Sequence, residues 1–274
     1  MNISYERRGS GSPLVLLHGI GHRWQAWEPV LDRLAESHDV IAVDLPGFGL
    51  SPALPEPYTV AAAVDAAVDS FKAMGITRPH LAGNSLGGML ALELASAGHA
   101  SSVTALSPAG FWATARGRAW ALRVLSMIRA TGRLPERTRT AMMTRKSFRL
   151  ASGSLLFGRP SRVPLEVMLA DLASMAAAPG FDSVARAGRD YFFQSVAPSV
   201  PVTIAWGTRD RILWPNQARR AAQLLPEARH VTLPRCGHVP MHDEPELVAR
   251  TILETCARAS AVAADGQDAE ENAR

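Results

Sequence analysis

Short apolar segments alternate with stretches of helical periodicity along most of the chain. Six of them have the length and composition of buried strands, at residues 14–17, 40–43, 79–82, 102–106, 202–206 and 230–233. Apolar residues at helical spacing follow several of these runs, most clearly at residues 59–74, 85–97 and 247–256. Strands that alternate with helices form a mostly parallel central sheet with helices on both faces, so the pattern predicts an α/β fold.

The segment 112–200 interrupts this alternation. It contains helical patterns, many arginines and several Gly/Pro breaks, but no convincing buried strand. We therefore predict that residues 1–111 and 201–256 form the α/β core and that residues 112–200 form a helical insertion between two strands of the sheet. Residues 257–274 are rich in Ala, Asp and Glu and are predicted to form a disordered tail.

The composition allows a sizeable core, with 47% hydrophobic and 20% charged residues. Two cysteines, Cys236 and Cys256, and a start without a secretory pattern favour a reducing, cytoplasmic setting. No apolar run approaches about 18 residues, so no transmembrane helix or stable membrane insertion is expected. The basic residues gather in the insertion. A solvated helical face is the favoured interpretation, binding of an acidic substrate or an anionic surface is the alternative, and no nucleic-acid partner is expected.

A serine flanked by glycines stands where the third apolar run turns into a helical pattern. Gly83 and Gly87 lie two residues to either side of Ser85. Such a turn lifts the hydroxyl above the sheet, and the glycines permit close backbone approach. The helix start adds free N–H groups and the positive end of the helix dipole. A serine hydroxyl is a weak nucleophile by itself, so a base is expected elsewhere in the chain.

A carboxylate and a histidine follow the fifth and sixth apolar runs. They are Asp210 and His238, which gives the chain order Ser, Asp, His. Asp210 could instead cap a helix or pair with a neighbouring arginine, and His238 could be a structural loop histidine. Asp182 and Asp190 are rival carboxylates within the insertion, and His242 is a rival histidine.

Four ordered motifs carry a resemblance to a known family. They are LLHGIG at 16–21, DLPGFGLS at 44–51, GNSLGG at 83–88, and GH at 237–238 with Glu244-Pro245 beyond. With these motifs the chain resembles the α/β-hydrolase fold superfamily, in its serine-nucleophile branch near carboxylesterases, C–C bond hydrolases and cofactor-free haloperoxidases. The resemblance covers the chain except for the insertion and the tail.

The resemblance implies a role for each candidate site residue. Ser85 would be the nucleophile, His238 its general base, and Asp210 the group that orients His238. The backbone N–H groups of Ile20 and Leu86 would form the oxyanion hole, and the insertion would be the cap over the site. No cofactor or metal is implied, and the chain shows neither a CxxC or HExxH spacing nor a phosphate loop.

The implied reaction is hydrolysis of a small to medium apolar carboxylic ester, thioester or lactone through an acyl-enzyme. Dehalogenases and epoxide hydrolases of this fold carry Asp at the position of Ser85, which argues against those activities. C–C hydrolysis of vinylogous diketones stays open, although Val239 stands where such enzymes usually carry Trp. A non-hydrolytic ligand-binding or biosynthetic protein is the other alternative. The expected partner is a small-molecule substrate, and its candidate contacts are Trp24, Asn84, Trp112, Leu213 and Val239.

Overall fold

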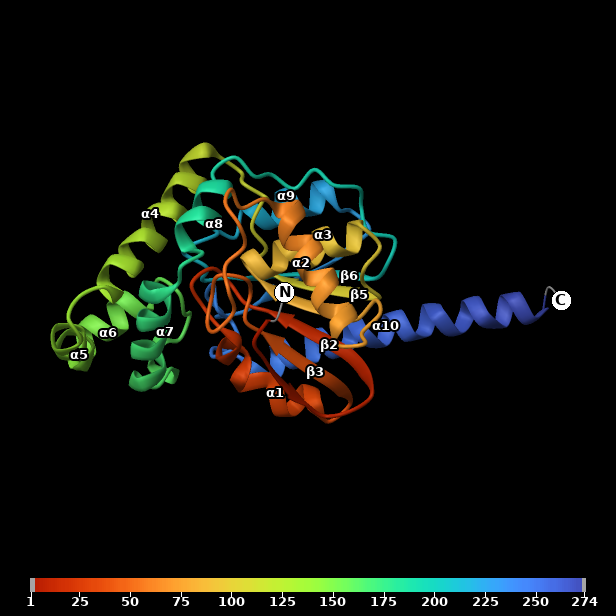
Figure 1. Ribbon diagram of the computed structural model, residues 1–274, viewed down its shortest axis with the longest axis horizontal. Coiled ribbons are helices and arrows are strands. Elements are labelled where there is room, and N and C mark those ends of the chain that lie inside the picture. Colours follow the sequence, from red (N-terminus) through yellow and green to blue (C-terminus); the bar gives the residue numbers. More distant parts are fainter. Residues whose placement is uncertain (1–2, 273–274) are drawn as a thin grey trace.

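A seven-stranded sheet forms the centre of the computed structural model, which describes the backbone of residues 3–272 and the side chains of residues 3–261 (Figure 1). The strand order is β1-β3-β2-β4-β5-β6-β7. Only β1 runs antiparallel to its neighbour; the other pairs are parallel. The strands are β1 (Tyr5–Arg8), β2 (Ser12–Leu17), β3 (His38–Val43), β4 (His80–Asn84), β5 (Ser102–Leu106), β6 (Val202–Gly207) and β7 (Arg229–Leu233).

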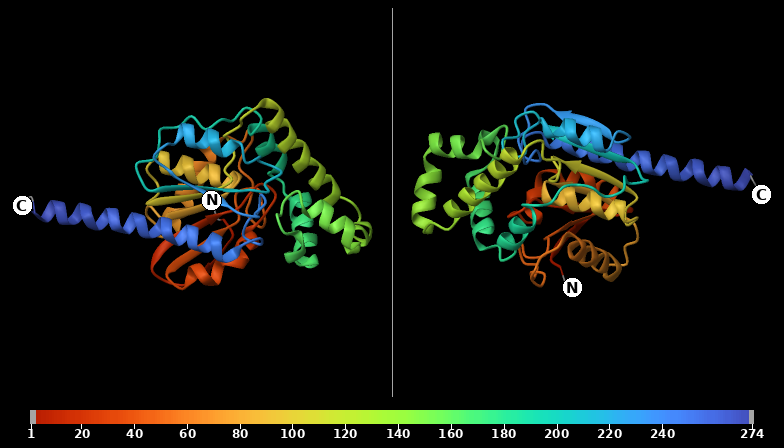
Figure 2. Two further views of the ribbon diagram at one scale, coloured as in Figure 1. Left: turned by 180° about the vertical axis from the view of Figure 1, so that it is seen from behind. Right: turned by 90° about the horizontal axis from the view of Figure 1, so that it is seen from above.

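Helices cover both faces of the sheet, which confirms the predicted α/β architecture. On one face, α1 (Glu28–Ala35), which follows the short helix η1 (Trp24–Trp27), packs beside α10 (Pro245–Asn272). On the other face, α3 (Leu86–Ser96) lies on β2, β4 and β5 and carries α2 (Val60–Ala73) beside it, while α9 (Gln217–Leu224) packs on β6. Figure 2 shows α10 running across its face of the sheet. Every residue of β4 and β5 is buried between these layers.

All six predicted strands are present, but β1, α1 and α9 were not predicted. β1 was missed because its sequence, YERR, alternates between half-buried and exposed positions at the edge of the sheet. An edge strand of this kind has no apolar run, and it is therefore hard to distinguish from a loop.

The insertion is helical, and it covers the carboxyl edge of the sheet. Between β5 and β6 lie α4 (Ala115–Gly132), α5 (Glu136–Thr144), α6 (Lys146–Gly153), η2 (Pro160–Arg162), α7 (Leu165–Ala177) and α8 (Phe181–Ala187). They gather at one end of the molecule in Figure 1. The insertion bonds to loops that follow strands: Gly180 N–H donates to Gly47 O (2.9 Å) and Val239 N–H to Leu156 O (3.0 Å). The domain limits 112–200 stay a prediction.

The last helix differs from the disordered tail expected from residue 257. α10 continues as far as Asn272 and extends away from the sheet on the side opposite the insertion (Figure 1). The physical reason is composition, since Ala and Glu are strong helix formers even where no large apolar side chain is present. Residues 273–274 of the predicted tail lie outside the described residues. Within the described part of the chain, no helix combines the length and apolar character needed to cross a bilayer.

Candidate active site

Ser85 occupies a strained turn between β4 and α3. Its backbone has φ +55° and ψ −111°, outside the regions that non-glycine residues favour. The flanking glycines make the turn possible. A Cβ on Gly83 would lie 2.1 Å from the carbonyl oxygen of Gly87, and one on Gly87 would lie 2.0 Å from that of Leu17. Because neither position has room for a side chain, strand, turn and helix stack closely and hold the Ser85 side chain at the carboxyl edge of the sheet.

Asp210 and His238 meet at the same edge, after β6 and β7. His238 Nδ1 lies 2.8 Å from Asp210 Oδ2, and both side chains are buried. The other carboxylate oxygen, Oδ1, accepts N–H bonds from Ile212 (2.9 Å) and Leu213 (2.8 Å). Three groups, the Nδ1 of His238 and the N–H groups of Ile212 and Leu213, thus fix the orientation of the carboxylate, which in turn holds Nδ1 of His238 as a donor. This arrangement leaves Nε2 free to accept a proton.

Asn84 connects the loop of His238 to the turn of Ser85. Its Nδ2 donates to the carbonyl oxygens of His238 (2.8 Å) and Leu106 (3.2 Å). No hydrogen bond joins Ser85 Oγ to His238 among the described side chains, 3–261. Such contacts are often long without substrate and tighten on binding. Sequence reasoning placed Asn84 among the substrate contacts, whereas both of its N–H groups are used on backbone carbonyls.

Two backbone N–H groups stand beside Ser85. Leu86 begins α3, where a helical N–H has no acceptor within the helix. Ile20 lies in the turn after β2, and the neighbouring Gly19 packs directly on the serine: a Cβ on Gly19 would lie 3.4 Å from Ser85 Cβ. No protein acceptor is present for the Ile20 N–H within residues 3–272. Both N–H groups are thus free of protein acceptors near the serine, and their use as an oxyanion hole stays a prediction.

His18 shapes this turn and does not act as a base. Its Nδ1 donates to Gly19 O (2.8 Å), and its Nε2 accepts the N–H of Leu45 (2.9 Å). Burial lowers the pKa of His18 to about 3, so the ring stays neutral. Asp44, directly after β3, also holds the loops in place, because its carboxylate accepts hydrogen bonds from the N–H groups of Trp24 (2.8 Å) and Leu50 (2.9 Å).

A buried carboxylate that sequence reasoning missed joins the insertion to the histidine loop. Asp243 accepts N–H bonds from Gly237 (2.7 Å), Gly158 (2.8 Å) and Arg159 (2.6 Å). Burial raises the pKa of Asp243, and these three donors oppose the rise. Gly158 and Gly237 pack so closely that a Cβ on Gly237 would lie 2.5 Å from Gly158 N. The position of His238 therefore depends on contacts with the insertion.

A cavity of about 410 Å³ lies inside the insertion. Its lining is mainly apolar and comes from α4 to α7: Met127, Ile128, Thr131, Met142, Met143, Phe148, Ala151, Ser152, Gly153, Leu155, Leu156, Phe157, Met168, Asp171, Leu172 and Met175, with His22 from the core. Ser85, Asp210 and His238 do not line it.

His22 stands between this cavity and the serine. A Cβ on Gly19 would lie 3.6 Å from His22 Nδ1 and 3.4 Å from Ser85 Cβ, so Gly19 packs between these two side chains. His22 Nε2 lies 4.0 Å from Asp171 Oδ2 of α7. Burial lowers the pKa of His22, and the Asp171 carboxylate opposes this effect. Sequence reasoning did not select His22, although it directly follows the HGIG segment, and nothing in the sequence pointed to Asp171.

None of the five residues predicted to contact substrate lines the cavity. Trp24 and Trp112 are half-buried, and Nε1 of Trp112 donates to Tyr191 O (2.8 Å). Leu213 and Val239 are buried beside Asp210 and His238, and their backbone N–H groups are used in the contacts described above. Their roles toward substrate, and that of Asn84, stay predictions.

The same architecture occurs in known proteins. A protein of Mycobacterium tuberculosis (strain ATCC 25618 / H37Rv) without an assigned function is 30% identical over 254 residues, which cover 86% of this chain and 73% of that protein. The pimeloyl-[acyl-carrier protein] methyl ester esterase of Legionella pneumophila (strain Paris) is 40% identical over 95 residues, 35% of this chain and 36% of that enzyme. The enol-lactonase from Burkholderia xenovorans LB400 shares the fold, with a TM-score of 0.74 and 20% identity over 93% of this chain and 96% of that one.

A family model matches nearly the whole described core and the insertion, from residue 14 to residue 251. Its description is "Alpha/beta hydrolase family". Together with the strand order and the turn at Ser85, this match shows that the chain belongs to the alpha/beta hydrolase family.

Proposed function

We propose that the protein is a serine hydrolase that cleaves a small to medium apolar carboxylic ester, thioester or lactone through an acyl-enzyme. The observation that carries this proposal is the hydrogen-bonded pair of Asp210 and His238 at the same sheet edge as the strained turn of Ser85. A nucleophile, an oriented base and two free N–H groups are the parts that acyl transfer requires.

In the proposed mechanism, Ser85 Oγ attacks the carbonyl carbon while His238 Nε2 accepts the hydroxyl proton. The oxyanion of the tetrahedral intermediate accepts hydrogen bonds from the N–H groups of Ile20 and Leu86, each typically worth about 3 kcal/mol of barrier. His238 then gives its proton to the leaving alcohol, and the acyl group stays on Ser85. A water molecule then attacks the acyl carbon while His238 Nε2 accepts its proton. The bond between this carbon and Ser85 Oγ breaks as His238 returns the proton to Oγ, and the acid is released. Asp210 stabilises the imidazolium in each half-reaction.

The apolar part of the substrate belongs in the cavity of the insertion. A volume of about 410 Å³ falls within the usual range of small-molecule sites, about 300–1,000 Å³. The methionines of the lining suit a flexible acyl chain, because their side chains adapt to irregular shapes. The acyl chain of the substrate would enter the cavity past Gly19 and His22, which separate Ser85 from it.

The similarity to the Legionella esterase supports ester hydrolysis, because its name states that reaction. It covers about a third of either chain, so it does not define the acyl group. Both cysteines of the present chain are free and buried, which fits the cytoplasmic setting expected from the sequence.

The first experiment is hydrolysis of p-nitrophenyl esters across a series of acyl lengths by the wild type and by Ser85→Ala. We expect the wild type to show an optimum at medium lengths and Ser85→Ala to lose several orders of magnitude in kcat. A fluorophosphonate probe should label the wild type and not the variant. Ser70→Ala, which removes a buried hydroxyl from α2, is the matched control and should keep both properties.

Ester turnover that survives in a correctly folded Ser85→Ala protein would overturn the mechanism. A wild type that is labelled at Ser85 but hydrolyses no ester would favour C–C cleavage, which is then tested with vinylogous diketones. A wild type that is not labelled would favour a non-hydrolytic role for the fold.

A further inference from the structure

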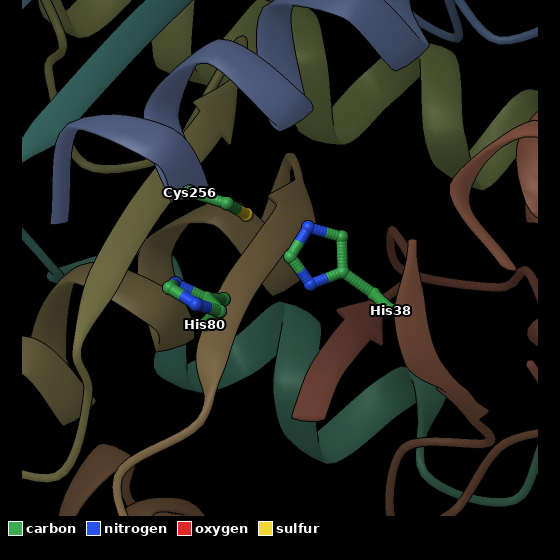
Figure 3. Close-up of side chains that lie close together, drawn as sticks. All are labelled: His38, His80 and Cys256. Carbon is green, nitrogen blue, oxygen red and sulfur yellow. The ribbon is translucent and has the colours of Figure 1, made fainter. Parts of the chain in front are cut away.

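Two histidines and a cysteine lie side by side at the end of the sheet opposite Ser85 (Figure 3). His38 begins β3, His80 begins β4, and Cys256 lies on α10. One ring nitrogen of each histidine and the sulfur of Cys256 all lie within 4.8 Å of one another. Ser85 follows the last residue of β4, so the five-residue strand places this cluster roughly 16 Å from the nucleophile, at about 3.3 Å per residue.

A serine on the neighbouring strand forms a hydrogen bond with Nδ1 of each histidine ring. His38 is the register partner of Ser12, and His38 Nδ1 lies 2.9 Å from Ser12 Oγ. His80 is the register partner of Ser102, and His80 Nδ1 lies 2.9 Å from Ser102 Oγ. Nδ1 of each ring is therefore engaged by a serine, and Ser101 Oγ also lies 3.1 Å from Nδ1 of His80. Within residues 3–261 no protein hydrogen bond engages Nε2 of either ring. Metal-binding histidines have this arrangement, in which a hydrogen bond to one nitrogen orients the other toward the metal.

The donor atoms suit a borderline-soft cation. Imidazole nitrogen and thiolate sulfur are both ligands that Zn²⁺ takes in proteins, whereas the cluster contains no carboxylate of the kind that Mg²⁺ and Ca²⁺ prefer. Burial, together with the nearby His38, lowers the pKa of His80 to about 4, so its ring is neutral and offers a lone pair. Burial raises the pKa of the Cys256 thiol to about 12. A bound cation would displace the thiol proton to solvent, as metal binding to cysteine generally does.

We propose that His38, His80 and Cys256 form a zinc-binding site that ties α10 to the amino edge of the sheet. Metal–ligand bonds of about 2.0 Å to nitrogen and 2.3 Å to sulfur place tetrahedral ligand atoms about 3.5 Å apart. The cluster must therefore contract slightly. His38 is half-buried, whereas His80 and Cys256 are buried, so there is most room for this adjustment on the side of His38. The Cys256 sulfur points toward the His38 ring in Figure 3. The fourth position would hold water, which can reach it from the side of His38.

The test is titration of the metal-stripped, full-length protein with Co²⁺, followed by Zn²⁺. We expect one Co²⁺ per chain, with a thiolate-to-cobalt charge-transfer band and the intense visible bands of a tetrahedral site. One equivalent of Zn²⁺ should remove these bands and raise the Tm. Cys256→Ser should abolish the charge-transfer band and lower the affinity for Zn²⁺ at least tenfold, and His80→Gln should also weaken binding.

Cys236→Ser is the matched control, because Cys236 is the other free, buried cysteine of the chain. It should keep the charge-transfer band and the affinity for Zn²⁺. Absence of the band in the wild type, or its persistence in Cys256→Ser, overturns the proposal. If Cys256→Ser does not fold, as judged by circular dichroism, His38→Gln carries the same test at the half-exposed side of the cluster.

Discussion

The backbone turn at Ser85 requires neighbouring residues without a Cβ atom. The serine adopts a positive φ of 55°, and the surrounding backbone must approach closely enough to hold it there. Gly87 has an ordinary helical backbone, so its requirement for glycine comes from space alone: the carbonyl oxygen of Leu17 occupies the place of a Cβ. Close packing between α3 and β2 thus fixes the proposed nucleophile, and the glycines are structural determinants of the candidate site.

Gly87→Ala should therefore destabilise the protein strongly. A Cβ placed 2.0 Å from the Leu17 carbonyl oxygen forces α3 away from β2, and we expect the free energy of unfolding to fall by at least about 3 kcal/mol. Gly188→Ala, at the end of α8, is the control. Its Cβ would meet its nearest atom at 3.4 Å, and its effect should stay within about 1 kcal/mol. Urea denaturation followed by circular dichroism measures both values. Equal effects of the two substitutions would contradict the packing argument.

At the scale of strands and helices, the sequence predicted the elements that have a local apolar pattern of their own. The strands before Ser85 and Asp210 are short, mainly apolar and fully buried, and the strand before His238 contains the short segment HVTL, so the three residues could be assigned to one edge of a parallel sheet. The metal site was not predicted, because His38, His80 and Cys256 become neighbours only through strand register and the packing of α10. The cavity was missed for a similar reason, since the packing of α4 to α7 leaves no periodic signal that marks an enclosed space.

The helices of the insertion should set the preferred acyl length. Leu155 follows α6 and lines the cavity, so Leu155→Trp should fill part of the volume and move the optimum to shorter esters. Met168→Ala, on α7, removes a buried side chain from the same lining and should move the optimum to longer esters. The kcat/KM for each member of the p-nitrophenyl ester series gives both shifts.

A control variant separates this effect from general damage to the site. Trp120→Ala changes an aromatic residue of α4 that does not line the cavity, and it should leave the order of preference unchanged. If Leu155→Trp and Met168→Ala changed all esters by the same factor, the cavity would not hold the acyl chain.

Across the whole molecule, the candidate active site lies where the loops of the core meet the insertion. Asp243 binds both sides of this contact, and His22 and Asp171 face each other across it. Polar groups are therefore buried deep in the structure, and several of them are histidines. Burial lowers the pKa values of His18, His22 and His242. Folding holds these rings neutral, and this couples the stability of the protein to pH.

The free energy of unfolding should consequently fall as the pH drops below about 6.5. His18 titrates near pH 3 in the folded chain but near 6.5 in the unfolded one, so the unfolded state binds an extra proton throughout that interval. Each pH unit within it costs about 1.4 kcal/mol, which gives a loss of about 2 kcal/mol for His18 alone between pH 6.5 and pH 5. Burial of His22 and His242 acts in the same direction.

Urea denaturation at pH 7.5 and pH 5, with a chelator present to keep metal out of the comparison, measures the loss. His18→Gln, which retains a donor and an acceptor but does not titrate, should reduce it. Equal stability at the two pH values would mean that these rings become protonated without unfolding, and that the contacts of His18 with Gly19 and Leu45 do not hold it neutral.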